Sequence, residues 1–326
     1  MTTNETAIRT QPRPRCCLCG AQGRTLYFGL RDRLFSAPGV WSFNRCANER
    51  CGLVWLDPAP VEDDLLKTYA AYYHNLNKGA PADQPGVAVR GLQFLWRGWA
   101  WLTTADRFQR NLERIRPAGA MLDVGCGTGD RLARMRGLGW TVEGLETNPD
   151  AATIAREKHR LIVHDGALEK ARLPSEGYDL ITLAHVIEHV NDPAAMLKEC
   201  RRLLRPAGAL FLNTPNGEGY GARTFGQDWI SLEPPRHLYL FCKAALDQLA
   251  RLAGFDRARV TALPGPNTLF SPLASLNVRR RGRHTPGRLP SPAIALRVPY
   301  HQLRQALLCR ISSQYGDELQ LQAKKC

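Results

Sequence analysis

The sequence predicts an α/β protein with a parallel sheet, and three observations support this fold class. Between residues 118 and 215, short apolar runs alternate with amphipathic stretches. Such alternation is typical of βαβ units, in which a crossover helix joins two parallel strands. A glycine-rich turn follows the first run, and an acidic residue ends the second. Because ligands of such sheets bind beyond the carboxyl ends of the strands, we expect a ligand crevice at that edge.

The alternating elements can be assigned in chain order. Strands are expected at AGAMLDV (118–124), WTVEGLE (140–146), RLIVHD (160–165), YDLITLAH (178–185) and GALFLNTP (208–215). Helices are expected at DRLARMRGLG (130–139), NPDAATIAREK (148–158) and DPAAMLKECRRLLRP (192–206). Gly139 closes the first of these helices, and an Asn-Pro start signal opens the second. The side chains expected around one crevice are those of residues 125–129, 146, 165, 185–189 and 213–216.

The composition divides the chain into five regions. Cysteine pairs and short β-like runs (TLYF, GVWSF, GLVWL) predict a small sheet module near the amino end. The predicted regions are a disordered arm (1–15), the cysteine module (16–60), a helical linker (61–118), the α/β core (119–265) and a basic, proline-rich extension (266–326). A last helix is expected near 299–323. Within the linker, GLQFLWRGWAWL (91–102) is either an interfacial helix or a core helix, and we favour core packing because Trp101 lies off the face that Trp96 and Trp99 share.

Length and hydropathy restrict the class of protein. A chain of 326 residues suits two domains, and its mean hydropathy of −0.31 is typical of a soluble protein. No apolar segment is long enough to cross a bilayer, and MTTNETAIRTQPRPR has no apolar signal core. We therefore expect a cytoplasmic protein without a transmembrane segment. A reducing cytoplasm would keep its ten cysteines as thiols rather than as a disulfide framework.

The positive charge is concentrated at the carboxyl end. From Arg257 onward there are twelve Lys and Arg residues but only two acids, Asp317 and Glu318, so this part carries +10 of the total +14. A basic tail can bind phosphates or anionic lipid, but it is more often simply solvated. We favour solvation, because no aromatic stacking pattern of a nucleic-acid module accompanies the charge.

LDVGCGTGD (122–130) has the context of a nucleotide loop, because it joins a strand to a helix. Its spacing differs from the dinucleotide fingerprint G-x-G-x-x-G, since Asp130 stands where the third glycine would be. Asp123 and Asp130 on either side of the turn favour a ligand with positive charge, such as a sulfonium. Glu146, 23 residues after Asp123, is placed to bind both hydroxyls of a ribose. The alternative is that the glycines only form a tight turn.

HVIEHVNDP (185–193) follows the fourth predicted strand. His185, Glu188 and His189 stand at i, i+3 and i+4, which is one face of a helical turn. A histidine held by a carboxylate can act as a general base at neutral pH. We therefore predict catalytic roles for Glu188 and His189 and assign His185 to the cofactor side of the crevice. The alternative is a histidine that caps a turn and hydrogen-bonds the backbone.

WISLEPPRHLYLF (229–241) predicts an extended loop, because Pro234 and Pro235 exclude helix. The loop would carry Arg236 and His237 over the site. A guanidinium beside an imidazole suits the recognition of phosphate or carboxylate, and His237 is the third predicted catalytic residue. The alternative is a structural loop in which Arg236 pairs with Glu233.

CCLCG and CANERCG each place a glycine after the second cysteine, which allows the backbone to turn its N–H groups toward the thiolates. Two such knuckles supply the four sulfurs of a closed tetrahedral zinc site: Cys16, Cys19, Cys46 and Cys51. Four thiolates leave no open coordination position, so the predicted Zn²⁺ is structural rather than catalytic. Cys17 could replace Cys16 only with a cramped one-residue gap.

The segments LDVGCGTG, YDLITLAHVIEHVNDP and LLRPAGALFLNTPN, together with Glu146, resemble the class I S-adenosylmethionine-dependent methyltransferases. The resemblance covers residues 119 to about 255 and implies a Rossmann-like sheet of seven strands. It also implies which residues hold the parts of S-adenosylmethionine: Asp123, Gly125, Gly127 and Gly129 the methionine part, Glu146 the ribose, and Asp165 the adenine amine.

Two further resemblances bear on metals. The stretch 185–193 is similar to one in methyltransferases of ubiquinone biosynthesis and in small-RNA 2′-O-methyltransferases, where Glu-x-x-Glu-His can bind a divalent cation. Here His185 stands where that pattern has its first Glu, so this sequence departs from the metal-binding pattern. The cysteine module resembles the zinc-binding domain that precedes some sugar methyltransferases, which suggests a saccharide acceptor.

The sequence therefore predicts a methyltransferase that uses S-adenosylmethionine, contains a structural zinc, and O-methylates a small-molecule or saccharide acceptor. The alternative is a nucleic-acid-associated methyltransferase or binding protein, with the zinc module and the basic tail as its docking surfaces. A third hypothesis is a non-catalytic scaffold that has kept the fold.

Overall fold

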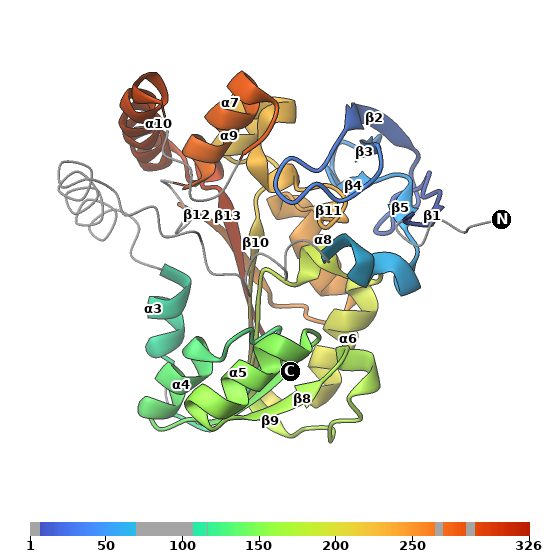
Figure 1. Ribbon diagram of the computed structural model, residues 1–326. Coiled ribbons are helices and arrows are strands. Elements are labelled where there is room, and N and C mark those ends of the chain that lie inside the picture. Colours follow the sequence, from blue (N-terminus) through green and yellow to red (C-terminus); the bar gives the residue numbers. More distant parts are fainter. Residues whose placement is uncertain (1–6, 70–106, 116, 265–269, 285–290) are drawn as a thin grey trace. The chain divides into compact units, whose positions relative to one another are not determined.

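The computed structural model describes residues 7–69, 107–115, 117–264, 270–284 and 291–326 (Figure 1). The chain divides into two compact units, each made of three stretches of sequence. The first unit consists of Met1–Asp106, Asn216–Leu240 and Ala262–Asp317, and the second of Arg107–Pro215, Phe241–Thr261 and Glu318–Cys326. The tryptophan-rich stretch 91–102 lies outside the described residues. The five regions predicted from the sequence remain predictions.

The second unit contains the sheet that the sequence predicts. Its seven strands are ordered β12-β13-β10-β9-β6-β7-β8, and the five strands from β10 to β8 run parallel. The strands are β6 (Ala120–Val124), β7 (Thr141–Glu146), β8 (Ile162–Asp165), β9 (Tyr178–Ala184), β10 (Leu204–Pro215), β12 (Arg259–Leu263) and β13 (Glu318–Lys324). β13 is antiparallel to β10. The α/β class and the seven-stranded Rossmann-like sheet are thus confirmed.

Helices alternate with these strands, and three of them lie where the sequence predicts helix: α4 (Asp130–Gly137), α5 (Pro149–His159) and α6 (Pro193–Leu203). The unit also contains α3 (Arg107–Glu113), α8 (Lys243–Leu252) and the single turns η2 (Leu168–Lys170) and η3 (Ile187–His189). The Asn-Pro start signal is confirmed, since the side chain of Asn148 accepts a hydrogen bond of 2.7 Å from Ala151 N. Asp192 caps α6 in the same way.

Apolar side chains from the strands and helices close the core of the second unit. Met121 and Leu180 on neighbouring strands are fully buried. Phe108 of α3 meets Phe211 of β10 edge to face, with the ring centroids 6.5 Å apart. This packing fixes the strand ends from which the candidate site is built.

The first unit contains the predicted cysteine module. Its strands are β1 (Thr10–Gln11), β2 (Gly23–Leu30), β3 (Trp41–Cys46), β4 (Val54–Leu56), β5 (Ala59–Pro60) and β11 (Tyr239–Leu240). Four of them form a sheet ordered β11-β4-β3-β2, and β1 pairs with β5. The unit also holds η1 (Glu62–Tyr69), α7 (Tyr220–Phe225), η4 (Gly226–Asp228), η5 (Ile230–Leu232), α9 (Phe270–Arg281), α10 (Pro292–Ile311) and η6 (Ser313–Tyr315). Trp41, Phe43 and Trp55 are buried in the module.

The carboxyl end differs from the helix expected near 299–323. α10 begins at Pro292 and ends at Ile311, and the chain then enters the seven-stranded sheet as β13. The segment ELQLQAK alternates apolar and polar residues, and Leu319, Leu321 and Ala323 are buried. An alternation of period two is typical of a strand, so the helix predicted for this segment is wrong beyond Ile311.

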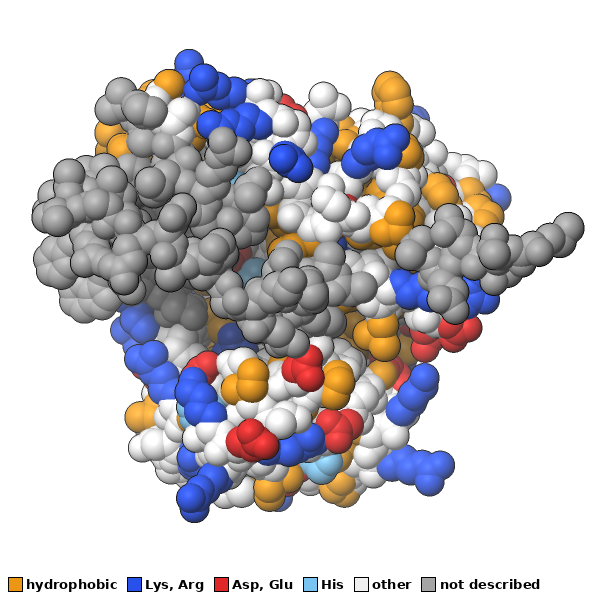
Figure 2. Space-filling view, viewed as in Figure 1, with side chains coloured by type: hydrophobic (Ala, Val, Ile, Leu, Met, Phe, Trp, Pro, Cys, Tyr) orange, Lys and Arg blue, Asp and Glu red, His pale blue; other side chains and the backbone are white. Residues whose placement is uncertain are grey.

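Charged side chains of both signs cover part of the second unit. Figure 2 shows Asp and Glu side chains among Lys and Arg side chains over α4 and α5. Among the described residues, no helix has the length and apolar character needed to cross a membrane.

Candidate functional site

The glycine turn after β6 forms a close-fitting loop at the carboxyl edge of the sheet. Gly125, Gly127 and Gly129 all adopt positive φ angles, of 69°, 55° and 80°. A Cβ at Gly129 would lie 2.9 Å from the Cβ of Ala155 on α5, so this position needs glycine for close helix packing. At Gly127 a Cβ would meet nothing within 4 Å. The turn is therefore packed on one side and open at its middle glycine.

Glu146 at the end of β7 is bound to this turn. One oxygen of its carboxylate accepts a hydrogen bond of 2.8 Å from Gly127 N, and the other accepts one of 2.8 Å from Asn148 N. Thr147 Oγ1 also donates, at 3.4 Å, to the oxygen that Asn148 N contacts, whereas the oxygen that Gly127 N contacts has a second lone pair that can accept a further bond. Asp165 stands opposite Glu146 in the β7–β8 register, with its side chain two-thirds exposed and paired with Arg156 at 2.8 Å.

The two aspartates that flank the turn lie in different environments. Asp123 is fully buried, accepts a hydrogen bond from Thr182 Oγ1, and lies 3.2 Å from Arg131 Nη1. Burial raises the pKa of Asp123, which Arg131 opposes. Asp130 is exposed and pairs with Lys158 of α5 at 2.8 Å. The sequence interpretation included both acids but not Arg131, whose charge offsets that of Asp123.

His185 lies between two carboxylates. Its Nδ1 is 3.2 Å from Glu188 Oε1, and its Nε2 is 3.4 Å from Glu318 Oε1. Glu188 is fully buried, and its second oxygen accepts a hydrogen bond of 2.9 Å from Thr214 Oγ1. Burial lowers the pKa of His185, but the bonds and charges of the two glutamates outweigh it and raise this pKa to about 10. His185 is thus an imidazolium at neutral pH.

This ion-pair arrangement predicts a specific pH dependence of stability. Because the pKa of His185 is about 10 in the folded protein and about 6.5 in an unfolded chain, its stabilising contribution is complete below about pH 6.5 and is lost as the pH rises toward 10. We expect His185→Gln to lower the free energy of unfolding strongly at pH 6 and hardly at pH 10, as measured by urea denaturation. A loss of equal size at both pH values would contradict the ion pairs.

His189 ends the short turn η3 and is half-buried. Its backbone N–H donates to Val186 O at 3.0 Å. A ring nitrogen of His189 lies within 4.8 Å of a carboxylate oxygen of Glu188. His185, Glu188 and His189 thus lie together on the second unit, and the carboxylate of Glu188 is hydrogen-bonded to His185 and Thr214.

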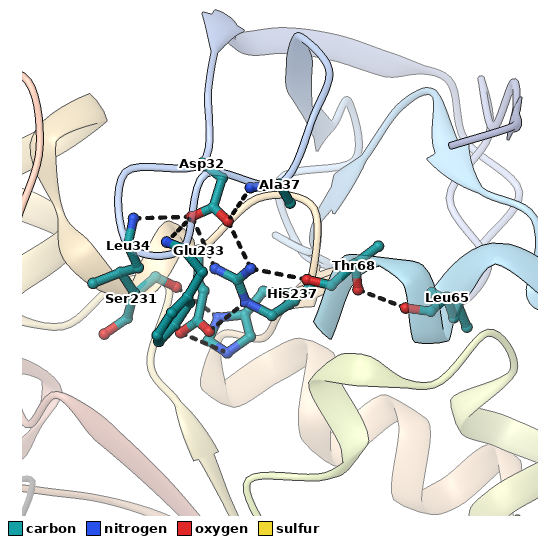
Figure 3. Close-up of polar contacts among 10 residues, drawn as sticks. Asp32, Leu34, Ala37, Leu65, Thr68, Ser231, Glu233 and His237 are labelled. Carbon is teal, nitrogen blue, oxygen red and sulfur yellow. Dashed lines mark hydrogen bonds and ion pairs between the residues drawn. The ribbon is translucent and has the colours of Figure 1, made fainter. Parts of the chain in front are cut away.

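The loop that carries Arg236 and His237 belongs to the first unit, and Figure 3 shows its polar contacts. Arg236 is buried, and its guanidinium donates to both oxygens of Asp32, at 2.7 and 3.0 Å. It also donates to Glu233 at 2.8 Å and to Thr68 O at 3.2 Å. These contacts occupy the fork of the guanidinium, which favours the structural alternative for Arg236.

His237 is buried beside this arginine. Its Nδ1 is 2.7 Å from Ser231 O, which fixes Nδ1 as the donor, and its Nε2 lies 3.8 Å from a carboxylate oxygen of Glu233 (Figure 3). The loop then continues into β11, where Tyr239 pairs with Trp55 of the cysteine module. Asp32 and β11 thus hold the loop in place, and the sequence predicts neither of these contacts.

The four predicted metal ligands come together in the first unit. Their four sulfur atoms all lie within 4.8 Å of one another: Cys16, Cys19, Cys46 and Cys51. Each knuckle turns back on itself, since Gly20 N donates to Cys16 O at 2.9 Å and Gly52 N to Asn48 O at 3.3 Å. Both glycines have positive φ angles, of 72° and 66°. Cys17 is exposed and stands outside the group.

The sequence of this chain is similar to those of known proteins. The family described as a methyltransferase domain matches residues 97–259, which is half of the chain. A ubiquinone biosynthesis O-methyltransferase from Thiobacillus denitrificans is 31% identical over 44% of this chain and 67% of that protein. A protein of the same name from Xanthomonas axonopodis pv. citri is 38% identical over 46% of this chain and 68% of that protein. Another, from Glaesserella parasuis, is 30% identical over 38% of this chain and 57% of that protein.

The chain thus spans between 57 and 68% of the length of these three relatives. Among solved structures, a SAM-dependent methyltransferase from Thermotoga maritima is 21% identical, with a TM-score of 0.47, over 74% of this chain and 96% of that one.

Proposed function

This chain belongs to the methyltransferase-domain family, and from that premise we propose that it transfers the methyl group of S-adenosylmethionine to a hydroxyl group of a small-molecule or glycan-type acceptor. The observation that carries the proposal is the backbone hydrogen bond from Gly127 by which Glu146 holds the glycine turn, while its other oxygen accepts from Asn148 N. Oxygen is proposed as the acceptor atom because the relatives are O-methyltransferases by name.

The residues at the sheet edge suit the parts of this cofactor. When bound, S-adenosylmethionine supplies an electrophilic methyl group on a positively charged sulfur. Glu146 would accept hydrogen bonds from the ribose hydroxyls through its remaining lone pairs, and Asp165 beside it would accept from the adenine amine. The turn would hold the methionine part, with the open side of Gly127 as the point of closest approach. Asp123, buried behind the turn with its charge offset by Arg131, is proposed to border the methionine part.

His189 is proposed as the general base that takes the proton from the acceptor hydroxyl. Its ring is half-buried near the carboxylate of Glu188, which can stabilise the imidazolium that forms. His185 is unsuited to this role, because a pKa of about 10 keeps it protonated. We propose instead that His185 holds Glu188 in place and borders the cofactor.

His189→Ala should lower turnover by roughly a hundredfold, the usual scale of general base catalysis. The affinity for S-adenosylmethionine should stay within about twofold, because the glycine turn and Glu146 are unchanged. A higher pH should partly restore turnover if the acceptor hydroxyl can ionise unaided. His164→Ala, which removes a histidine of β8 paired with Glu143, is the matched control and should turn over normally. Normal turnover of His189→Ala would remove it from the mechanism.

His237 is proposed to bind the acceptor rather than to move a proton in the rate-limiting step. His237→Ala should therefore raise the KM for the acceptor more than it lowers kcat. Steady-state kinetics with saturating S-adenosylmethionine measure this split. A fall in kcat as large as that of His189→Ala would instead give His237 a catalytic role.

We also propose that the four cysteines hold a structural zinc. A tetrahedral site with zinc–sulfur bonds of about 2.3 Å places its sulfurs roughly 3.8 Å apart. The Cys16–Cys51 and Cys19–Cys46 sulfurs are 3.6 and 3.4 Å apart, which supports this geometry. The proposed site stabilises the sheet to which the His237 loop is joined through β11.

The class of acceptor can be tested directly. We expect S-adenosylhomocysteine to form when phenolic or sugar hydroxyl compounds are supplied with S-adenosylmethionine. RNA or DNA binding, titrated with salt, should be weak and should disappear at physiological ionic strength. Methylation of nucleic acid, without reaction of any small acceptor, would overturn this proposal in favour of the nucleic-acid alternative.

A further inference from the structure

Helix α10 exposes an apolar stripe along one face. Its inward face buries Val298, His301 and Gln305. On the opposite face the side chains of four apolar residues are at least half exposed: Tyr300 (59%), Leu303 (56%), Leu307 (50%) and Ile311 (81%). Their spacing of three and four residues aligns them along the helix over three turns. A surface helix normally exposes polar residues there, so a continuous apolar stripe indicates a binding surface.

Arginines border this stripe on both sides. At about 100° per residue, Arg297 and Arg304 flank one side of it and Arg310 the other. Three more arginines end α9 or follow it, Arg280, Arg281 and Arg283, whereas Arg279 pairs with Asp228 at 3.0 Å. The sequence has no Asp or Glu between residues 257 and 316. Figure 2 shows blue side chains at the top of the view, over α7 and α9.

We propose that α10 docks on an anionic lipid bilayer, with the stripe inserted among the acyl chains and the arginines on the lipid phosphates. An apolar face bordered by cationic side chains is the pattern of helices that lie in the membrane interface. The charge of the surrounding arginines is complementary to anionic headgroups, and their guanidinium groups bind phosphate oxygens well. The docking is peripheral, in agreement with the lack of a spanning helix among the described residues.

A second copy of the chain fits this surface less well. In a two-fold contact the stripe would meet itself, so the arginines of each copy would approach those of the other without acidic partners on the stripe. Nucleic acid also fits less well, because three of the four stripe residues are aliphatic and cannot stack on bases. Anionic lipid satisfies both the apolar and the charged part of the surface.

Vesicle flotation of the full chain tests the proposal. We expect binding to vesicles of phosphatidylcholine with about 30% phosphatidylglycerol and little binding to phosphatidylcholine alone, because bilayer surface charge attracts the arginines. The triple variant Leu303→Gln/Leu307→Gln/Ile311→Gln should partition at least about tenfold less, since it removes three inserting apolar side chains. Ile162→Gln, an equally exposed aliphatic residue on β8, is the matched control and should bind like the wild type.

Two further measurements keep the proposal falsifiable. Circular dichroism should show that the triple variant is folded, because its changed side chains are at the surface; otherwise Arg297→Gln/Arg310→Gln replaces it and should weaken binding to anionic vesicles about tenfold. Equal flotation of the stripe variant and the wild type would overturn the proposal. So would an absence of wild-type binding, or a dimer in sedimentation velocity that the triple variant dissociates.

Discussion

Cys46→Ser should unfold the cysteine module and lower the free energy of unfolding of the first unit by at least about 5 kcal/mol. Loss of one thiolate opens the proposed tetrahedral site, and a sheet of this size has little core of its own to replace the metal. Trp41 and Trp55 are buried in the module, so their fluorescence should shift to longer wavelength when it unfolds. Metal analysis should find about one zinc in the wild type and much less in the variant.

Cys17→Ser is the matched control, since Cys17 is next to a proposed ligand but is exposed and outside the group of four. It should keep the zinc and the wild-type fluorescence. A chelator should reproduce the Cys46→Ser result on the wild type. Wild-type protein purified without chelators that contains no zinc, with four thiols free to react, would contradict the proposed site.

Glu146→Ala should weaken S-adenosylmethionine binding at least about a hundredfold, or ~2.7 kcal/mol. The change removes the proposed acceptor of two ribose hydroxyls, and it also releases the backbone N–H groups of Gly127 and Asn148 from the carboxylate that holds them. Calorimetric titration of the cofactor measures the affinity.

Glu143→Ala provides the matched control on the same strand. Glu143 lies three residues before Glu146 and bonds His164 and Tyr178 instead of the glycine turn. Cofactor affinity should therefore be unchanged in this variant. Glu146→Ala with wild-type affinity would assign the carboxylate to loop structure alone.

The glycine turn, its acidic partner and the helix cap could be predicted from the sequence because each depends on residues close together in the chain. The glycine spacing, the acid at the end of the second strand and the Asn-Pro cap all act within a few residues or across one βαβ unit. Glu146 and the turn were accordingly predicted as parts of one site, and the structure brings them into contact. The cysteine knuckles were predictable for the same reason, since each is a short turn that ends in glycine.

The ion pairs of the candidate site that the sequence did not predict join residues far apart in the chain. Arg236 pairs with Asp32 across 204 residues, and Glu318 reaches His185 only because the last strand enters the sheet beside β10. Once ELQLQAK is assigned to a helix, Glu318 has no predicted place near the site, and only Glu188 is left to raise the pKa of His185. A correct strand assignment would have placed Glu318 at the carboxyl end of β10, opposite Pro215.

The central claim is transfer of the methyl group from S-adenosylmethionine to oxygen, and its most direct test is to follow that carbon. S-adenosylmethionine labelled with ¹³C at the methyl group would be incubated with the protein and a hydroxyl acceptor, and the reaction followed by NMR. We expect the sulfonium methyl signal to decline as a methoxy signal rises at the same rate, with equimolar S-adenosylhomocysteine, and with both rates roughly a hundredfold lower in His189→Ala. A label that remains on sulfur with every hydroxyl acceptor, or that appears on nitrogen or carbon, would contradict the account.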